Sequence, residues 1–82
     1  MNIENGSIVR AKAGRDKNQF FLVLKVEDGY AYIADGKRRR LESPKKKNLI
    51  HLAATNTVIK GSVETNPQLK RILSNFTDKN GG

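Results

Sequence analysis

Two clusters of cationic side chains are the residues of this chain most suited to chemistry. Residues 36–47 hold seven basic side chains and one acidic one, and residues 10–17 hold four basic side chains and one acidic one. Lysine and arginine bind phosphate oxygens, and such contacts supply most of the non-specific affinity for nucleic acids. A single run of like charges is more often a solvated surface. Two runs beside strand-like segments favour a surface for a polyanion.

The side chains that most enzymes use are scarce. His51 is the only histidine, and its apolar neighbours offer no partner for general base catalysis. The chain has no cysteine, so it has no disulfide or thiolate metal site. Asp28 and Asp35 each precede a glycine in a turn, where aspartate bonds the local backbone. We therefore expect no enzymatic activity, no catalytic residue, no metal and no cofactor.

Length and composition limit the class of protein. With 82 residues, we expect one domain with a thin core. The net charge of +8 favours an anionic partner. The longest apolar stretch, residues 20–24, is too short to span a bilayer, and the N-terminus lacks the pattern of a signal peptide. We expect a cytoplasmic protein that does not bind membranes.

Alternation of apolar and polar residues predicts five short strands. Asp-Gly pairs at 28–29 and 35–36 are typical of hairpin turns, so Gly29 and Gly36 are expected to be turn residues, as is Gly14. Residues 45–48 are expected to form a loop after Pro44. The predicted strands cover residues 7–13, 19–26, 30–34, 37–41 and 49–52.

Short strands joined by tight turns are typical of a small barrel. Five strands in so short a chain fit an SH3-like barrel better than a sandwich. The predicted fold is therefore mainly β, a small five-stranded antiparallel SH3-like barrel with a short C-terminal α-helix. We expect the barrel at residues 1–60, a helical extension packed on it at 61–77, and a frayed tail at 78–82.

The helix is predicted from its apolar stripe and its start signal. Asn66 is a favourable N-cap and Pro67 fits the first helical position. Four apolar residues follow at helical spacing, namely Leu69, Ile72, Leu73 and Phe76. We expect this stripe to cover Phe21 and Val23, because the strand at 19–26 is apolar on both faces. The alternative is a partner-binding helix.

Aromatic side chains bear on nucleic-acid recognition because unpaired bases stack on exposed rings. Tyr30 and Tyr32 alternate onto one side of their strand, where they form either a stacking platform or part of the core. With so few candidate rings, we expect recognition of the backbone and shape of structured RNA rather than of single-strand bases.

Residues 6–24 resemble the KOW motif, in which a glycine, an alternating strand, a glycine turn, a basic loop and a second apolar strand follow one another. The run from Ala13 to Lys17, Ala-Gly-Arg-Asp-Lys, is the distinctive part. Residues 32–39, 44–47 and 51–52 are also similar to one branch of that family. This branch holds bacterial relatives of large-subunit ribosomal protein fourteen of the archaeal and eukaryotic type. The resemblance covers about residues 5–60.

The resemblance implies an SH3-like barrel that binds RNA, generally ribosomal RNA. By motif position, Gly14 matches the signature turn glycine, and Arg15 and Lys17 fall in the basic loop. Asn18 replaces a second glycine that many members have, although asparagine also tolerates positive φ. The family includes transcription elongation factors whose KOW domains contact polymerase or other proteins.

We therefore expect an RNA-binding, ribosome-associated monomer. The predicted RNA contacts are Lys12, Arg15, Lys17, Lys37, Arg38, Arg39, Arg40, Lys45, Lys46 and Lys47. Two alternatives remain open. One is a protein-interaction module of the transcription or translation machinery, with ribosomal or transcription proteins as partners. The other is a small barrel that binds duplex DNA.

Overall fold

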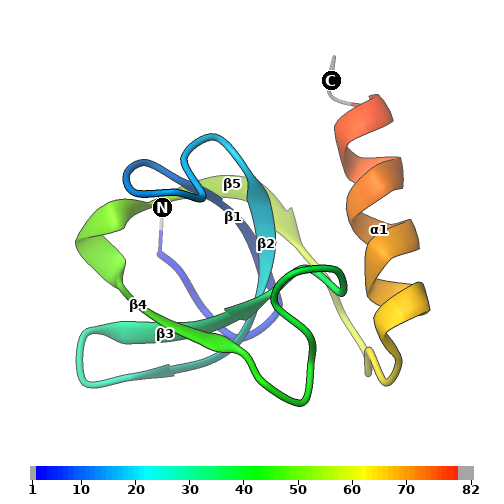
Figure 1. The fold of residues 1–82 in the computed structure, drawn as a ribbon, viewed down its shortest axis with the longest axis horizontal. Coiled ribbons are helices and arrows are strands. Elements are labelled where there is room, and N and C mark those ends of the chain that lie inside the picture. The colour runs from blue at the N-terminus through cyan, green and yellow to red at the C-terminus, as the bar shows by residue number, and fades with distance from the viewer. Residues whose placement is uncertain (1, 80–82) are drawn as a thin grey trace.

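The computed structural model describes residues 2–79, which form five strands and one long helix. The strands pair antiparallel in the order β4-β3-β2-β1-β5 and curl into a small barrel with α1 alongside (Figure 1). The elements are β1 (Ser7–Ala11), β2 (Phe20–Glu27), β3 (Tyr30–Ala34), β4 (Lys45–Asn48), a 3-10 helix (Leu49–His51), β5 (Leu52–Val58) and α1 (Asn66–Lys79).

This architecture confirms the predicted fold class, a mainly β domain with five antiparallel strands and a C-terminal helix. Its shape matches a small SH3-like barrel. The hydrogen-bonded sheet is nevertheless open, because its order begins at β4 and ends at β5. Among the described residues, no helix is long and apolar enough to cross a membrane.

The last two strands lie later in the chain than predicted. Residues 37–41 form a loop, because the Asp35 carboxylate accepts hydrogen bonds from the backbone N–H groups of Lys37 and Arg39 and closes a local turn. The strand instead follows Pro44, at the lysines that were expected to form a loop. The fifth strand is β5, and most of the segment predicted as its strand is the 3-10 helix.

The two apolar faces of β2 belong to two separate cores. Phe21 and Val23 point into the barrel, where they pack with residues of β1, β3 and β5. Leu22 faces outward and packs with Leu69 and Leu73 of α1. The predicted apolar stripe of α1 therefore does cover β2. The prediction that it covers Phe21 and Val23 was wrong, because the barrel's own strands bury that face.

The helix start differs from the prediction by one residue. The Thr65 hydroxyl accepts a hydrogen bond from the Gln68 backbone N–H at 3.2 Å, which is the contact of an N-cap. Asn66 is instead the first helical residue, and Pro67 is the second. The helix runs to Lys79, two residues beyond the predicted end. Residues 80–82 of the predicted tail lie outside the described residues.

Candidate nucleic-acid interface

The β1–β2 loop, residues 12–19, is closed by its own backbone. The Asn18 N–H donates to the Ala11 carbonyl at 2.8 Å, and the Ala11 N–H donates to the Gln19 carbonyl at 3.0 Å. Gly14 and Asn18 have φ of 83° and 70°, as expected for a glycine turn with an asparagine in place of a second glycine. This compact loop holds three exposed cations, namely Lys12, Arg15 and Lys17.

The β3–β4 loop, residues 35–44, is held in place by contacts with α1. Asn66 of α1 accepts a hydrogen bond from the Leu41 backbone N–H at 2.8 Å and donates one to the Glu42 carboxylate at 2.8 Å. Gly36 is buried, and a Cβ placed on it would lie 2.5 Å from the Asn66 carbonyl oxygen. The loop therefore rests directly on the first turn of α1, toward which it extends in Figure 1.

Asp16 joins the two loops. Its side chain is buried, and one carboxylate oxygen lies 3.2 Å from Arg39 Nη2 and 3.6 Å from Lys45 Nζ. Burial opposes ionisation of this carboxyl. The hydrogen bond from Arg39 and the nearby positive charges outweigh that effect and hold the pKa of Asp16 below its usual value. An ionised carboxylate thus fixes the β3–β4 segment, by which we mean the loop together with β4 (residues 35–48), against the β1–β2 loop.

Strand alternation divides the three consecutive lysines of β4. Lys45 and Lys47 pair with Ile33 and Ala31, whose side chains face the barrel core. Their ammonium groups reach the β1–β2 loop, where Lys47 donates to the Ala13 carbonyl at 3.1 Å. Lys46 points to the other face of the sheet. Two of these predicted RNA contacts are therefore half-buried and engaged within the protein.

The arginine run is divided as well. Arg39 is half-buried against Asp16, and its Nε is buried with no hydrogen-bond partner among the described residues. Arg40 is exposed but lies 3.0 Å from the Glu42 carboxylate. Hydrogen bonds from Asn66, from the backbone and from Arg40 lower the pKa of Glu42 to about 2. Lys37 and Arg38 are exposed and have no ion pair in the described part of the chain.

The ten predicted contacts thus fall into two groups. Four bind a carboxylate or a backbone carbonyl of the protein and are called engaged, namely Arg39, Arg40, Lys45 and Lys47. The other six are exposed and, within residues 2–79, paired with no carboxylate. These six, which we call the free cations, are Lys12, Arg15, Lys17, Lys37, Arg38 and Lys46.

The two tyrosines lie on the outer face of β3, each beside a lysine. Tyr30 is 36% exposed, and the Lys46 ammonium lies 4.6 Å from its ring centroid. Tyr32 is half-buried, with the Lys25 ammonium 6.0 Å from its ring centroid. Neither ring is in the barrel core, because Ala31 and Ile33 occupy that face. This outer face therefore combines positive charge with aromatic rings, which are the two features that a surface for single-stranded nucleic acid needs.

Sequence reasoning missed two residues that organise the site. The sequence analysis includes Asp16 only as part of the run from Ala13 to Lys17 that resembles the KOW motif, and Asn66 only as a helix cap. Each is a short polar residue that is buried in the structure, which a single sequence does not reveal. His51 is exposed in the 3-10 helix. No group of three or more potential metal ligands occurs within residues 2–79.

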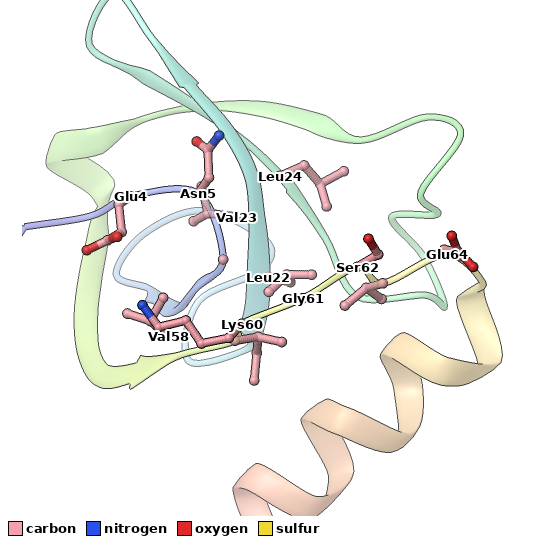
Figure 2. Close-up of a pocket in the computed structure, with 13 residues that line it drawn as sticks. Glu4, Asn5, Leu22, Val23, Leu24, Val58, Lys60, Gly61, Ser62 and Glu64 are labelled. Atoms are coloured by element: carbon pink, nitrogen blue, oxygen red, sulfur yellow. The ribbon is translucent and has the colours of Figure 1, made fainter.

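A separate groove, of about 610 Å³, lies between the N-terminal segment, β2 and the linker from β5 to α1. Figure 2 shows Glu4 and Asn5 on one side of it and the linker with Lys60 and Glu64 on the other. Its walls carry two carboxylates and one ammonium group. This charge balance does not favour a phosphate.

Comparison of the chain with protein-family models and with curated proteins finds no match. The resemblance to the KOW motif therefore rests on the residues quoted above.

Proposed function

We propose that this protein is a non-enzymatic RNA-binding protein that grips structured RNA, in the first place ribosomal RNA, through the free cations of its two basic loops. The proposal extends the KOW resemblance to residues whose positions are now known. It assigns the phosphate contacts to the β1–β2 loop, the β3–β4 loop and Lys46, and it assigns the engaged cations to holding the loops in place.

The observation that carries the proposal is the Asp16 contact between the loops. Because Asp16 binds both Arg39 and Lys45, it holds the two segments that carry the exposed cations against each other. A surface that is fixed before binding loses less conformational freedom when it orders a partner. The Asp16 carboxylate is buried and already pairs with Arg39 and Lys45, so it does not neutralise the exposed cations nearby.

Structured RNA suits this surface better than a single strand. Proteins that bind single-stranded nucleic acids without sequence preference carry a groove lined with aromatic rings, on which the bases stack. Here the rings on the outer face of the sheet are Tyr30 and Tyr32, and both already lie beside lysines, Lys46 and Lys25 respectively. Arginine and lysine on two adjacent loops instead match the phosphates on either side of a groove of folded RNA.

A protein-interaction module is the second candidate, and one observation favours it. Ile50 is 69% exposed in the 3-10 helix, at the same end of β3 as the exposed Tyr30. An exposed aliphatic and an aromatic side chain together are typical of a hot spot for a protein partner. In that case the partner is a ribosomal or transcription protein with an acidic surface.

Crosslinking in cells followed by sequencing of the attached RNA tests the proposal. We expect enrichment of ribosomal RNA, and loss of crosslinking when Arg15, Lys17, Lys37 and Arg38 are all replaced by glutamine. Co-purification before and after nuclease treatment separates the two candidates. Partners that are lost with nuclease support RNA binding, whereas protein partners retained by the quadruple variant support the interaction module.

A further inference from the structure

A groove between α1 and the two basic loops combines an apolar floor with a cationic rim. Its volume is about 480 Å³, within the range of small-ligand sites. Phe20 and Leu73 provide the apolar surface, and Lys37, Lys70 and Arg71 provide the positive charges. Lys37 is also one of the free cations, so the groove continues the surface described above.

The charges of the groove leave it net positive. Asp35 is the one carboxylate among its walls, and its Oδ1 already accepts hydrogen bonds from the Lys37 and Arg39 backbone N–H groups. Lys70 and Arg71 are exposed on α1 and make no ion pair with any described residue. An anionic group therefore meets two or three unpaired cations at the rim.

The walls of the groove also suit a flat ring. Phe20 is half-buried, and its ring is fixed by an edge-to-face contact with Phe76, with centroids 5.3 Å apart. Gln19 is exposed at the mouth of the groove, and its amide both donates and accepts hydrogen bonds. An apolar floor, a nearby amide and a cationic rim together match the parts of a nucleotide, which are a base with polar edges and a phosphate.

We propose that this groove holds one unpaired nucleotide of the bound RNA, with its base against Phe20 and Leu73 and its phosphate at Lys70 and Arg71. The inference rests on the proposed function and extends it to α1, which lies outside the KOW resemblance. Unstacked bases in bulges and loops are the usual targets of specific RNA recognition. The groove thus gives the protein a preference for helices interrupted by an unpaired base.

The test compares two RNA hairpins that differ only in a single bulged adenosine. We expect the full-length protein to bind the bulged hairpin about tenfold more tightly, the effect of stacking one base on protein. Ser74 lines the groove and is exposed on α1, so Ser74→Trp fills the groove without altering charge or core. This variant should bind both hairpins with the affinity that the wild type has for the paired one.

Asn75→Trp is the matched control, because Asn75 is exposed on the same helix but does not line the groove. It should keep the preference for the bulge. Lys70→Gln with Arg71→Gln should also reduce that preference. Fluorescence of 2-aminopurine in place of the adenosine should change on binding to the wild type and not on binding to Ser74→Trp.

The outcomes separate this inference from the proposed function. If the wild type binds both hairpins equally, or if Ser74→Trp keeps the preference for the bulge, the groove does not hold a nucleotide. The proposal that the two basic loops bind RNA is then unaffected. If an acidic peptide, but neither hairpin, binds in a manner that Ser74→Trp abolishes, the groove serves a protein partner. If the wild type binds neither hairpin, both the inference and the proposed function fail.

Discussion

The β1–β2 loop and the β3–β4 segment are both rich in basic residues but are held in place in opposite ways. The β1–β2 loop is closed by backbone hydrogen bonds between residues close together in the chain, such as Asn18 to Ala11. The β3–β4 segment is held by distant residues, namely Asp16, Ala13 and Asn66. All three cations of the first loop are exposed, whereas four of the seven in the second segment are engaged. Charge density in a sequence is therefore a poor measure of charge available to a partner.

Disrupting the contact between the β3–β4 loop and α1 should cause the largest loss of stability. In Gly36→Ala, the new Cβ meets a positive φ of 82° and a carbonyl oxygen 2.5 Å away. We expect the free energy of unfolding to fall by about 3 kcal/mol, since strain and a steric clash add. Urea unfolding of the wild type and the variant measures this change in the free energy of unfolding.

Gly29→Ala is the matched control for that change. Gly29 has the same φ of 82°, but a Cβ there meets nothing within 4 Å. Only the backbone strain remains, which costs about 1 kcal/mol. Equal losses in the two variants would show that the contact with α1 does not hold the loop.

Removing the carboxylate that joins the two loops should have the next largest effect. In Asp16→Asn, Arg39 and Lys45 lose their shared partner. Their side chains are 31% and 35% exposed, so water compensates in part and we expect a loss of about 2 kcal/mol, below the range for a fully buried pair. Thermal or urea unfolding checks this, with Asp28→Asn, an exposed turn residue, as the control that leaves stability unchanged.

RNA binding should depend equally on the exposed cations of both segments. Arg15→Gln with Lys17→Gln, and Lys37→Gln with Arg38→Gln, should each weaken binding to folded RNA by about tenfold and lower the salt slope by about 2, one for each phosphate contact. Lys60→Gln, in the linker before α1, should change neither. If only one double variant weakens binding, the two loops do not act as one surface.

Lowering the pH should reduce the difference in the free energy of unfolding between the wild type and Asp16→Asn. The folded-state pKa of Asp16 lies below its ordinary value, so its stabilising effect is complete above that ordinary value and is lost as pH falls through the folded one. The stability difference between the two proteins should therefore narrow from about pH 5 downward. Glu42, whose pKa is about 2, adds a loss with acid that both proteins share. A constant difference across this range would mean that Asp16 is not the group that titrates.

The sequence was informative where structure depends on near neighbours. The apolar run within residues 19–26 predicted β2, and the spacing from Leu69 to Phe76 predicted the packed face of α1. Prediction failed at one local contact, because the Asp35 side chain closes a turn that makes the arginine run a loop. It also failed where distant contacts decide the structure, since Lys45–Asn48 forms a strand by pairing with β3.

The same distinction holds within the candidate site. The predicted turns at Gly14, Gly29 and Gly36 all have positive φ. The engagement of Arg39 and Lys45 was not predictable, because it depends on a carboxylate that is buried only once both loops are folded. One sequence also gave no indication that Asn66 would bind the β3–β4 loop.

The dependence of RNA affinity on salt concentration tests the central claim most directly. If the free cations of the two loops neutralise about five phosphates, the logarithm of the association constant for a folded ribosomal RNA fragment should fall with the logarithm of salt concentration, with a slope of about −3.5 to −4.5. The variant that lacks Arg15, Lys17, Lys37 and Arg38 should show a slope of only about −0.7 to −0.9, because about one of the five contacts remains. An affinity that does not change with salt, or a slope that the variant retains in full, would contradict the account.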